Sequence, residues 1–116
     1  MRQYLLALFL LLFFLIPSSA QETPKREFRG AWIQTVYQPQ YAEMDSAAMR
    51  GYFDAMLDTL QRSGINALLF QIRPESDAFY ESNIEPWSRF LTGKQGRSPE
   101  RGWDPMAYLI GKCHER

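Results

Sequence analysis

The residues whose side chains can do chemistry gather in the stretch from Arg73 to Trp103. Carboxylates can act as general acids or bases, and guanidinium groups can bind a planar oxygen-rich ligand. The stretch brings acidic, basic and aromatic residues together, namely Arg73, Glu75, Asp77, Phe79, Tyr80, Glu81, Trp87, Arg89, Phe90 and Trp103. A loop of about 30 residues without helical or strand periodicity is uncommon unless it is functional. We therefore expect a binding or catalytic loop here.

The segments before this loop must position it. Residues 28–36 are rich in β-branched and aromatic residues and predict a strand. A helix is predicted from about Asp45 to Arg62, because apolar residues recur there at steps of three and four: Met49, Tyr52, Phe53, Met56, Leu57 and Leu60. Residues 65–72 are almost continuously apolar, which is typical of a strand buried on both faces. The order strand, helix, strand predicts a β-α-β unit with parallel strands.

Local signals refine these elements. Asp45 or Ser46 can cap the first helix, and Gly64 fits the left-handed residue after its end. Asp58 and Arg62 have the spacing of an i,i+4 ion pair. Residues 37–43 are predicted to form a loop with Pro39 as the breaker, and a last helix is predicted to begin at Asp104-Pro105 and to continue at Arg116.

The N-terminus has the pattern of a secretory signal peptide. Arg2 gives a short positive region, residues 4–16 are unbroken apolar, and Ser18-Ser19-Ala20 supplies small residues for cleavage after Ala20. The apolar run is shorter than the roughly 20 residues that a spanning helix needs, which favours a cleaved signal peptide. An uncleaved membrane anchor is the alternative. We expect a signal peptide at 1–20, a leader at 21–27 and a folded part at 28–116, in a secreted or periplasmic protein without stable membrane insertion after cleavage.

Length and composition exclude several classes. The chain has 116 residues, which allows one domain at most. Residues 21–116 carry 12 Lys and Arg against 13 Asp and Glu, because the first 20 residues contain only Arg2. This balance excludes a strongly basic nucleic-acid-binding protein. The single cysteine, Cys113, excludes a disulfide-stapled fold and is expected to be a buried small hydrophobe, with an intermolecular partner as the alternative.

No cofactor or metal is expected from the sequence. His114 is the only histidine, and no cysteine or second histidine near it gives a metal-binding spacing. It is interpreted as a structural or surface residue. No glycine-rich phosphate loop follows the first predicted strand, so the usual signature of nucleotide binding is missing from the sequence.

Six short motifs resemble the glycosyl-hydrolase-like family ten, in the order and spacing of that family. They are Arg29–Ile33, Phe70–Pro74, Asp77–Tyr80, Pro86–Ser88, Leu91–Gly93 and Trp103–Pro105. The resemblance covers about residues 27–116. It implies an α/β fold of the eight-stranded β/α (TIM) barrel type, in an exported bacterial glycoside hydrolase that acts on a polysaccharide, with cell-wall glycan as the first guess.

A barrel needs about 250 residues, so we expect this chain to be its N-terminal part. We then expect the chain to be inactive alone, with the catalytic carboxylate pair on later strands. A small domain that dimerises to cover its sheet edges is the alternative. Three functions stay open: a glycoside hydrolase, a barrel that binds glycan without cleaving it, and a short secreted interaction module.

The resemblance assigns candidate roles at the carboxyl ends of the strands, where barrel enzymes carry their active sites. Arg73 can bind sugar hydroxyls or a substrate carboxylate, or can pair with Glu75 or Asp77 and only shape the loop. Asp77 is the best carboxylate candidate, ahead of Glu75 and Glu81. Glycoside hydrolysis needs two carboxyl groups, and Asp77 can be one of them, can bind a sugar hydroxyl, or can cap the loop.

Aromatic residues are candidates for stacking on a sugar ring. Tyr80 and Trp87 can stack or can pack the loop onto the barrel, whereas packing is favoured for Trp103. Gln34 shares one face of the first strand with Trp32, since neighbouring residues alternate faces. That face can point into the barrel near the substrate, although core packing is favoured for Trp32. Asp104 is interpreted as a helix cap.

Overall fold

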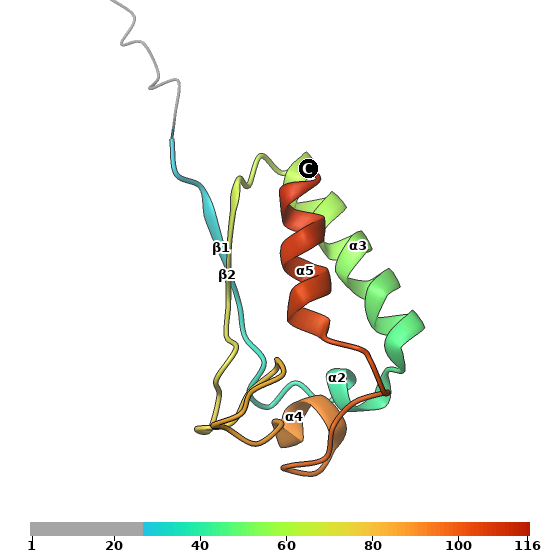
Figure 1. The fold of residues 1–116 in the computed structure, drawn as a ribbon. Helices are drawn as coiled ribbons and strands as arrows, with labels where there is room; N and C mark the ends of the chain where they lie inside the picture. Colours follow the sequence, from blue (N-terminus) through green and yellow to red (C-terminus); the bar gives the residue numbers. More distant parts are fainter. Residues whose placement is uncertain (1–26) are drawn as a thin grey trace, which may run out of the picture.

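The computed structural model describes residues 27–116, so the predicted signal peptide and the leader residues 21–26 lie outside the described residues. The described chain forms β1 (Gly30–Ile33), α2 (Gln40–Glu43), α3 (Ser46–Arg62), β2 (Ala67–Phe70), α4 (Arg89–Thr92) and α5 (Pro105–His114), as Figure 1 shows. None of the helices in this part of the chain is long and apolar enough to cross a membrane.

The two strands confirm the predicted parallel β-α-β unit. β1 pairs with β2 in parallel, from Gly30 opposite Ala67 to Ile33 opposite Phe70, and α3 connects them. Both strands are shorter than predicted because amide side chains replace the backbone partners at the ends of the ladder. Asn66 Oδ1 accepts from Arg29 N at 2.8 Å, and Gln71 Oε1 accepts from Thr35 N at 3.0 Å.

A helical layer covers one face of this sheet. Figure 1 shows α3 and α5 side by side, with α2 and α4 at the end where both strands finish. The predicted apolar face of α3 is confirmed, since Met49, Phe53 and Leu57 are buried. The buried core also takes residues from α2, the long loop, α4 and α5: Tyr41, Phe79, Leu91, Trp103, Met106 and Leu109.

Aromatic rings join the helical layer to the long loop. The Tyr41 ring meets the Phe70 ring at 6.1 Å and the Phe79 ring at 5.6 Å, both edge-on, and Phe53 meets Phe70 in the same way at 5.9 Å. Burial, together with the neighbouring Tyr52, raises the pKa of the Tyr41 hydroxyl. The start of the long loop is therefore fixed to the same core as α3.

The predicted helix caps are confirmed. Asp45 Oδ1 accepts from Ala48 N at 2.8 Å, and Asp104 Oδ1 accepts from Met106 N at 2.8 Å and from Ala107 N at 3.0 Å. These contacts satisfy amide groups that have no partner in the first helical turn. Gly64 lies at φ +78° after α3, as expected.

Four expectations need correction. Trp32 is 63% exposed rather than packed, because the helices cover the opposite face of the sheet, toward which its neighbours Ala31 and Ile33 are half-buried. The stretches 37–43 and 73–103 contain α2 and α4, which at four residues each are too short to show a helical period. α5 ends at His114, before Arg116.

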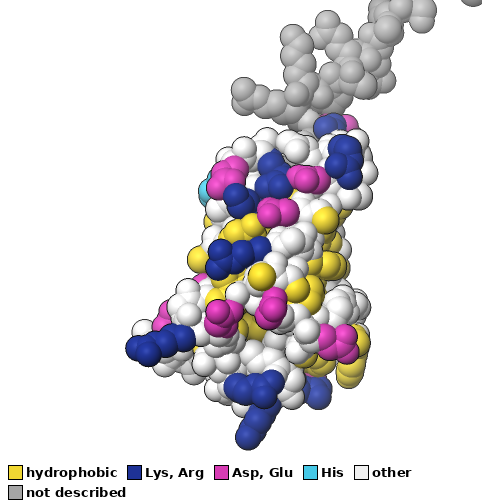
Figure 2. All heavy atoms as spheres, turned by 90° about the vertical axis from the view of Figure 1, so that its right-hand side faces the viewer, with side chains coloured by type: hydrophobic (Ala, Val, Ile, Leu, Met, Phe, Trp, Pro, Cys, Tyr) yellow, Lys and Arg dark blue, Asp and Glu magenta, His cyan; other side chains and the backbone are white. Residues whose placement is uncertain are grey.

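The fourth correction concerns the predicted pair of Asp58 and Arg62. Asp58 Oδ1 instead accepts from Arg116 Nη2 at 2.7 Å, and the same guanidinium lies 3.6 Å from Asp54 Oδ1. Tyr108 Oη donates to Asp54 Oδ2 at 2.7 Å. Polar contacts thus tie α5 to α3, and Figure 2 shows charges of both signs interspersed over the α3 side of the molecule.

Candidate functional site

Both strands finish at the same end of the sheet, where α2, α4 and the long loop gather (Figure 1). The parallel ladder makes this unavoidable, because the carboxyl ends of parallel neighbours share one edge. Residues predicted from different motifs therefore lie at this one end of the sheet. Gln34 follows β1 directly, and Arg73 and Asp77 follow β2.

Arg73 is joined to a carboxylate that sequence reasoning missed. Its guanidinium forms an ion pair with Glu85 Oε1, and Tyr80 Oη donates to Glu85 Oε2 at 3.4 Å. The Glu85 side chain is only 14% exposed, whereas the Arg73 side chain is 55% exposed. The alternative partners for Arg73, Glu75 and Asp77, are wrong. Glu85 directly precedes the Pro86–Ser88 motif, which was the one available signal for it.

Glu75 pairs with Arg89 instead. Arg89 Nε donates to Glu75 Oε2 at 2.7 Å and Nη2 donates to Oε1 at 2.8 Å, so the planar guanidinium binds both carboxylate oxygens. The hydrogen bond from Arg89, and then its charge, lower the pKa of the Glu75 carboxyl. The same contacts raise the pKa of Arg89. The pair fastens the loop after β2 to the start of α4.

Asp77 is fully buried. In the sequence it lies between Glu75 of one ion pair and Glu85 of the other. Its Oδ1 accepts from Glu75 N at 3.3 Å, while Oδ2 is buried and has no hydrogen-bond partner among the described residues. The next residue, Ala78, bridges in parallel to Trp87, with Ser88 N donating to Ala78 O at 2.8 Å. The loop-capping contact is thus observed, and a catalytic or sugar-binding role for Asp77 stays a prediction.

The other predicted residues differ in accessibility. Gln34 is exposed and donates from Nε2 to Val36 O at 2.9 Å. Tyr80 and Trp87 are half-buried, so each presents part of its ring. Trp103 is buried beneath the Arg50 guanidinium, which lies 4.4 Å from its ring centroid, as the favoured packing role requires. Sequence reasoning did not single out Tyr37, an exposed aromatic residue in the loop after β1.

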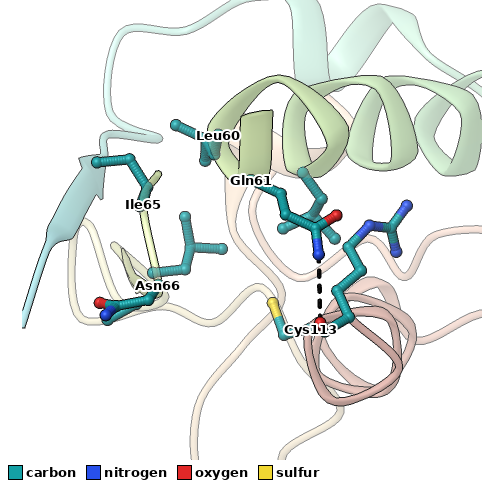
Figure 3. A pocket seen from close by; sticks show the side chains of 9 residues that line it. Leu60, Gln61, Ile65, Asn66 and Cys113 are labelled. Carbon is teal, nitrogen blue, oxygen red and sulfur yellow. Dashed lines mark hydrogen bonds between the residues drawn. The ribbon is translucent and has the colours of Figure 1, made fainter. Parts of the chain in front are cut away.

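A cavity of about 280 Å³ lies elsewhere, between α3, β2 and α5, near the amino end of β2. Figure 3 shows Cys113 projecting from α5 toward the space between Gln61 and Asn66. Burial raises the pKa of the Cys113 thiol, and the side chain is half-buried. Nothing in this cavity adjoins the charged residues at the strand ends.

Among residues 27–116, no cluster of three or more His, Cys, Asp or Glu side chains is arranged to hold a metal ion. His114 is exposed on the last turn of α5.

Comparison with known proteins places the chain in a family. Residues 27–116 match the sequence model of the family Glycosyl hydrolase-like 10, and the chain belongs to this family. It is 38% identical over 104 residues to the protein named glycosyl hydrolase YngK of Bacillus subtilis, a match that covers 87% of this chain and 20% of that protein. It is 34% identical over 110 residues to the protein named glycosyl hydrolase DigH of Escherichia coli K12, covering 86% and 25%.

The chain therefore spans a quarter or less of the length of these relatives. The match includes both strands, the long loop and α5, so it contains all the contacts at the strand ends described above.

Proposed function

We propose that this chain belongs to an exported glycoside hydrolase that acts on a polysaccharide, with bacterial cell-wall glycan as the first substrate to test. The observation that carries the proposal is the family match over residues 27–116, shared with relatives named glycosyl hydrolases. The export signal at residues 1–20 belongs to the proposal, on the sequence pattern alone.

We further propose that the described elements are the first part of a β/α barrel. A parallel strand pair with α3 and α5 on one face supports this arrangement. An open groove of about 650 Å³ along β2 and α5 supports it too, because apolar side chains line it, including Phe70, Ile72 and Leu109. A third parallel strand paired with β2 would cover this groove.

In such a barrel, Arg73 faces the substrate from the end of β2. Its exposed guanidinium offers donors to sugar hydroxyls or to a carboxylate. Glu85, which itself accepts from Tyr80 Oη, holds the guanidinium in place, which reduces the entropy lost on binding. Gln34, Tyr80 and Trp87 are the other proposed contacts with sugar. The acid and base of hydrolysis are two carboxyl groups of the complete barrel.

A second candidate function is glycan binding without cleavage. It is favoured by the state of the carboxylates at the strand ends of the described chain, where Glu75 and Glu85 are paired with arginines and Asp77 is buried. The pair with Arg89 lowers the pKa of the Glu75 carboxyl and favours its ionised form, which makes Glu75 a poor general acid.

The test uses the complete gene product that carries this sequence. We expect it to release reducing ends from purified cell-wall glycan strands. Arg73→Met should lower kcat/KM by about 10-fold to 100-fold, since a charged hydrogen bond to substrate is lost. Arg62→Met is the matched control, because Arg62 is exposed at the far end of α3. Saturable binding without product would favour the second candidate, and neither binding nor product on any polysaccharide would refute both.

A further inference from the structure

We propose that Tyr37 is a sugar-stacking residue that forms a carbohydrate subsite with Phe90 and the Arg89–Glu75 pair. The proposal rests on the proposed function and adds a subsite to it. Its ligand class is a pyranose unit of the polysaccharide, bound through an apolar ring face and through the hydroxyl groups at the ring edge.

The first observation is exposure at the right place. Tyr37 lies four residues after β1, at the end of the sheet where Arg73 and Glu75 follow β2. It is 74% exposed, although most other aromatic residues of this region are buried or half-buried. Its ring meets Phe90 at 5.8 Å with an angle of 75° between the ring planes. Such an edge contact fixes the ring and covers at most one of its faces.

The second observation is backbone conformation. Tyr37 has φ +56°, in the left-handed region that a bulky residue rarely adopts. Glycine or asparagine would occupy this position with less strain. Since the exposed ring buries little surface in return, packing within the described chain does not explain why a tyrosine is there. Strain of this kind gathers at ligand sites, where it fixes a side chain in place.

The third observation is the chemistry next to the ring. Phe90 contacts Tyr37 on one side, and the Arg89 guanidinium lies 4.6 Å from the Phe90 ring centroid. Arg89 in turn binds both oxygens of Glu75. Charged donors and acceptors thus lie next to Phe90, the ring that Tyr37 contacts. A pyranose is complementary to this arrangement, because it has C–H groups on its face and hydroxyls at its edge.

The experiment compares three variants of the complete gene product in glycan hydrolysis and in thermal unfolding. Tyr37→Gly removes the ring and the strain, so we expect KM to rise about tenfold, while Tm stays the same or rises. Tyr37→Trp restores an aromatic face and should bring KM back to within about twofold of the unaltered protein. Phe28→Ala removes an equally exposed ring before β1, at the opposite end of that strand, and should leave KM unchanged.

The outcomes separate this subsite from the function on which it rests. An unchanged KM in Tyr37→Gly, with normal hydrolysis by the unaltered protein, would overturn the subsite and leave the proposed function standing. A lower Tm with unchanged KM would overturn it too, because Tyr37 would then be a packing residue. If the unaltered protein neither cleaves nor binds any glycan, the proposed function and the subsite both fail.

Discussion

The helical layer of α3 and α5 differs from the loops at the carboxyl ends of β1 and β2 in the kind of side chain that it buries. Between α3 and α5 the buried side chains are apolar, and the polar contacts, such as Arg116 with Asp58, lie on the outside. At the strand ends the chain buries polar side chains, namely Thr35, Asp77, Ser88 and Thr92. Both non-glycine residues with positive φ in the described chain, Tyr37 and Ser76, also lie there.

The two regions therefore contribute differently: the helical layer stabilises the fold, and the loops hold the site in one geometry. Apolar burial stabilises the fold roughly in proportion to area, so the helical layer supplies most of the stability. Buried polar groups and strained residues add little stability, but they hold a loop in one geometry when every partner is in place. We therefore expect substitutions in the helical layer to change the free energy of unfolding, and substitutions in the loops to change binding.

The largest expected effect is in the helical layer. Phe53 is fully buried and contacts Phe70 and Tyr41, so Phe53→Ala leaves a cavity and should lower the free energy of unfolding by about 3–5 kcal/mol. Urea denaturation of the complete gene product measures it. Ile84→Ala in the exposed loop is the control, with an expected change within about 0.5 kcal/mol. Equal effects at both sites would remove the contrast between the two regions.

A smaller effect is expected where the two regions meet. Asp104 caps α5 and its Oδ2 also accepts from Glu81 N at 3.3 Å, in the long loop. Asp104→Ala should lower the free energy of unfolding by about 1–2 kcal/mol. Asp45→Ala, which removes only the cap of α3, should cost about 1 kcal/mol. The same denaturation assay compares them, and a larger loss for Asp45→Ala would show that Asp104 does not link loop and helix.

The smallest effect is a pH dependence in the loops. The folded-state pKa of Glu75 is lowered by Arg89, so its contribution to stability is present above the ordinary pKa of 4.5 and disappears as the pH falls through the folded pKa. In Arg89→Gln the pKa of Glu75 should rise toward 4.5. An NMR titration of the Glu75 carboxyl measures the shift. Arg97→Gln, another exposed arginine nearby in the chain, should leave it unchanged, and an unmoved pKa in Arg89→Gln would contradict the pairing.

The sequence could predict elements in which an apolar repeat continues over several turns or in which a side chain caps a helix locally. The apolar face of α3 repeats over about three turns, from Met49 to Leu60, and the caps Asp45 and Asp104 act on amides two or three residues away. The parallel pairing followed from the order of the elements. The exposure of Trp32 could not be predicted, because it depends on which face of the sheet the helices cover.

The candidate site was less predictable, because its pairs join distant residues. The alternative considered for Arg73 was a pair with the near neighbours Glu75 or Asp77, yet its partner Glu85 lies 12 residues away, brought close by the bridge between Ala78 and Trp87. The Arg116–Asp58 pair spans 58 residues and displaced the local pair expected from i,i+4 spacing. The charges in the sequence do not identify the ion-pair partner of a residue when the path of a loop or the packing of helices determines which charged side chains come into contact.

The parallel pairing also leaves β1 without its partner strand for an interval during synthesis. The segments joined at the first rung of the ladder lie 37 residues apart, because α3 must cross between β1 and β2. At about 5–20 residues per second, the ribosome needs about 2–7 s to complete that interval. Throughout it the apolar residues Ala31, Trp32 and Ile33 of β1 have no strand to pair with. Each nascent chain thus offers an unpaired apolar strand to chaperones and to other copies of itself before β2 emerges.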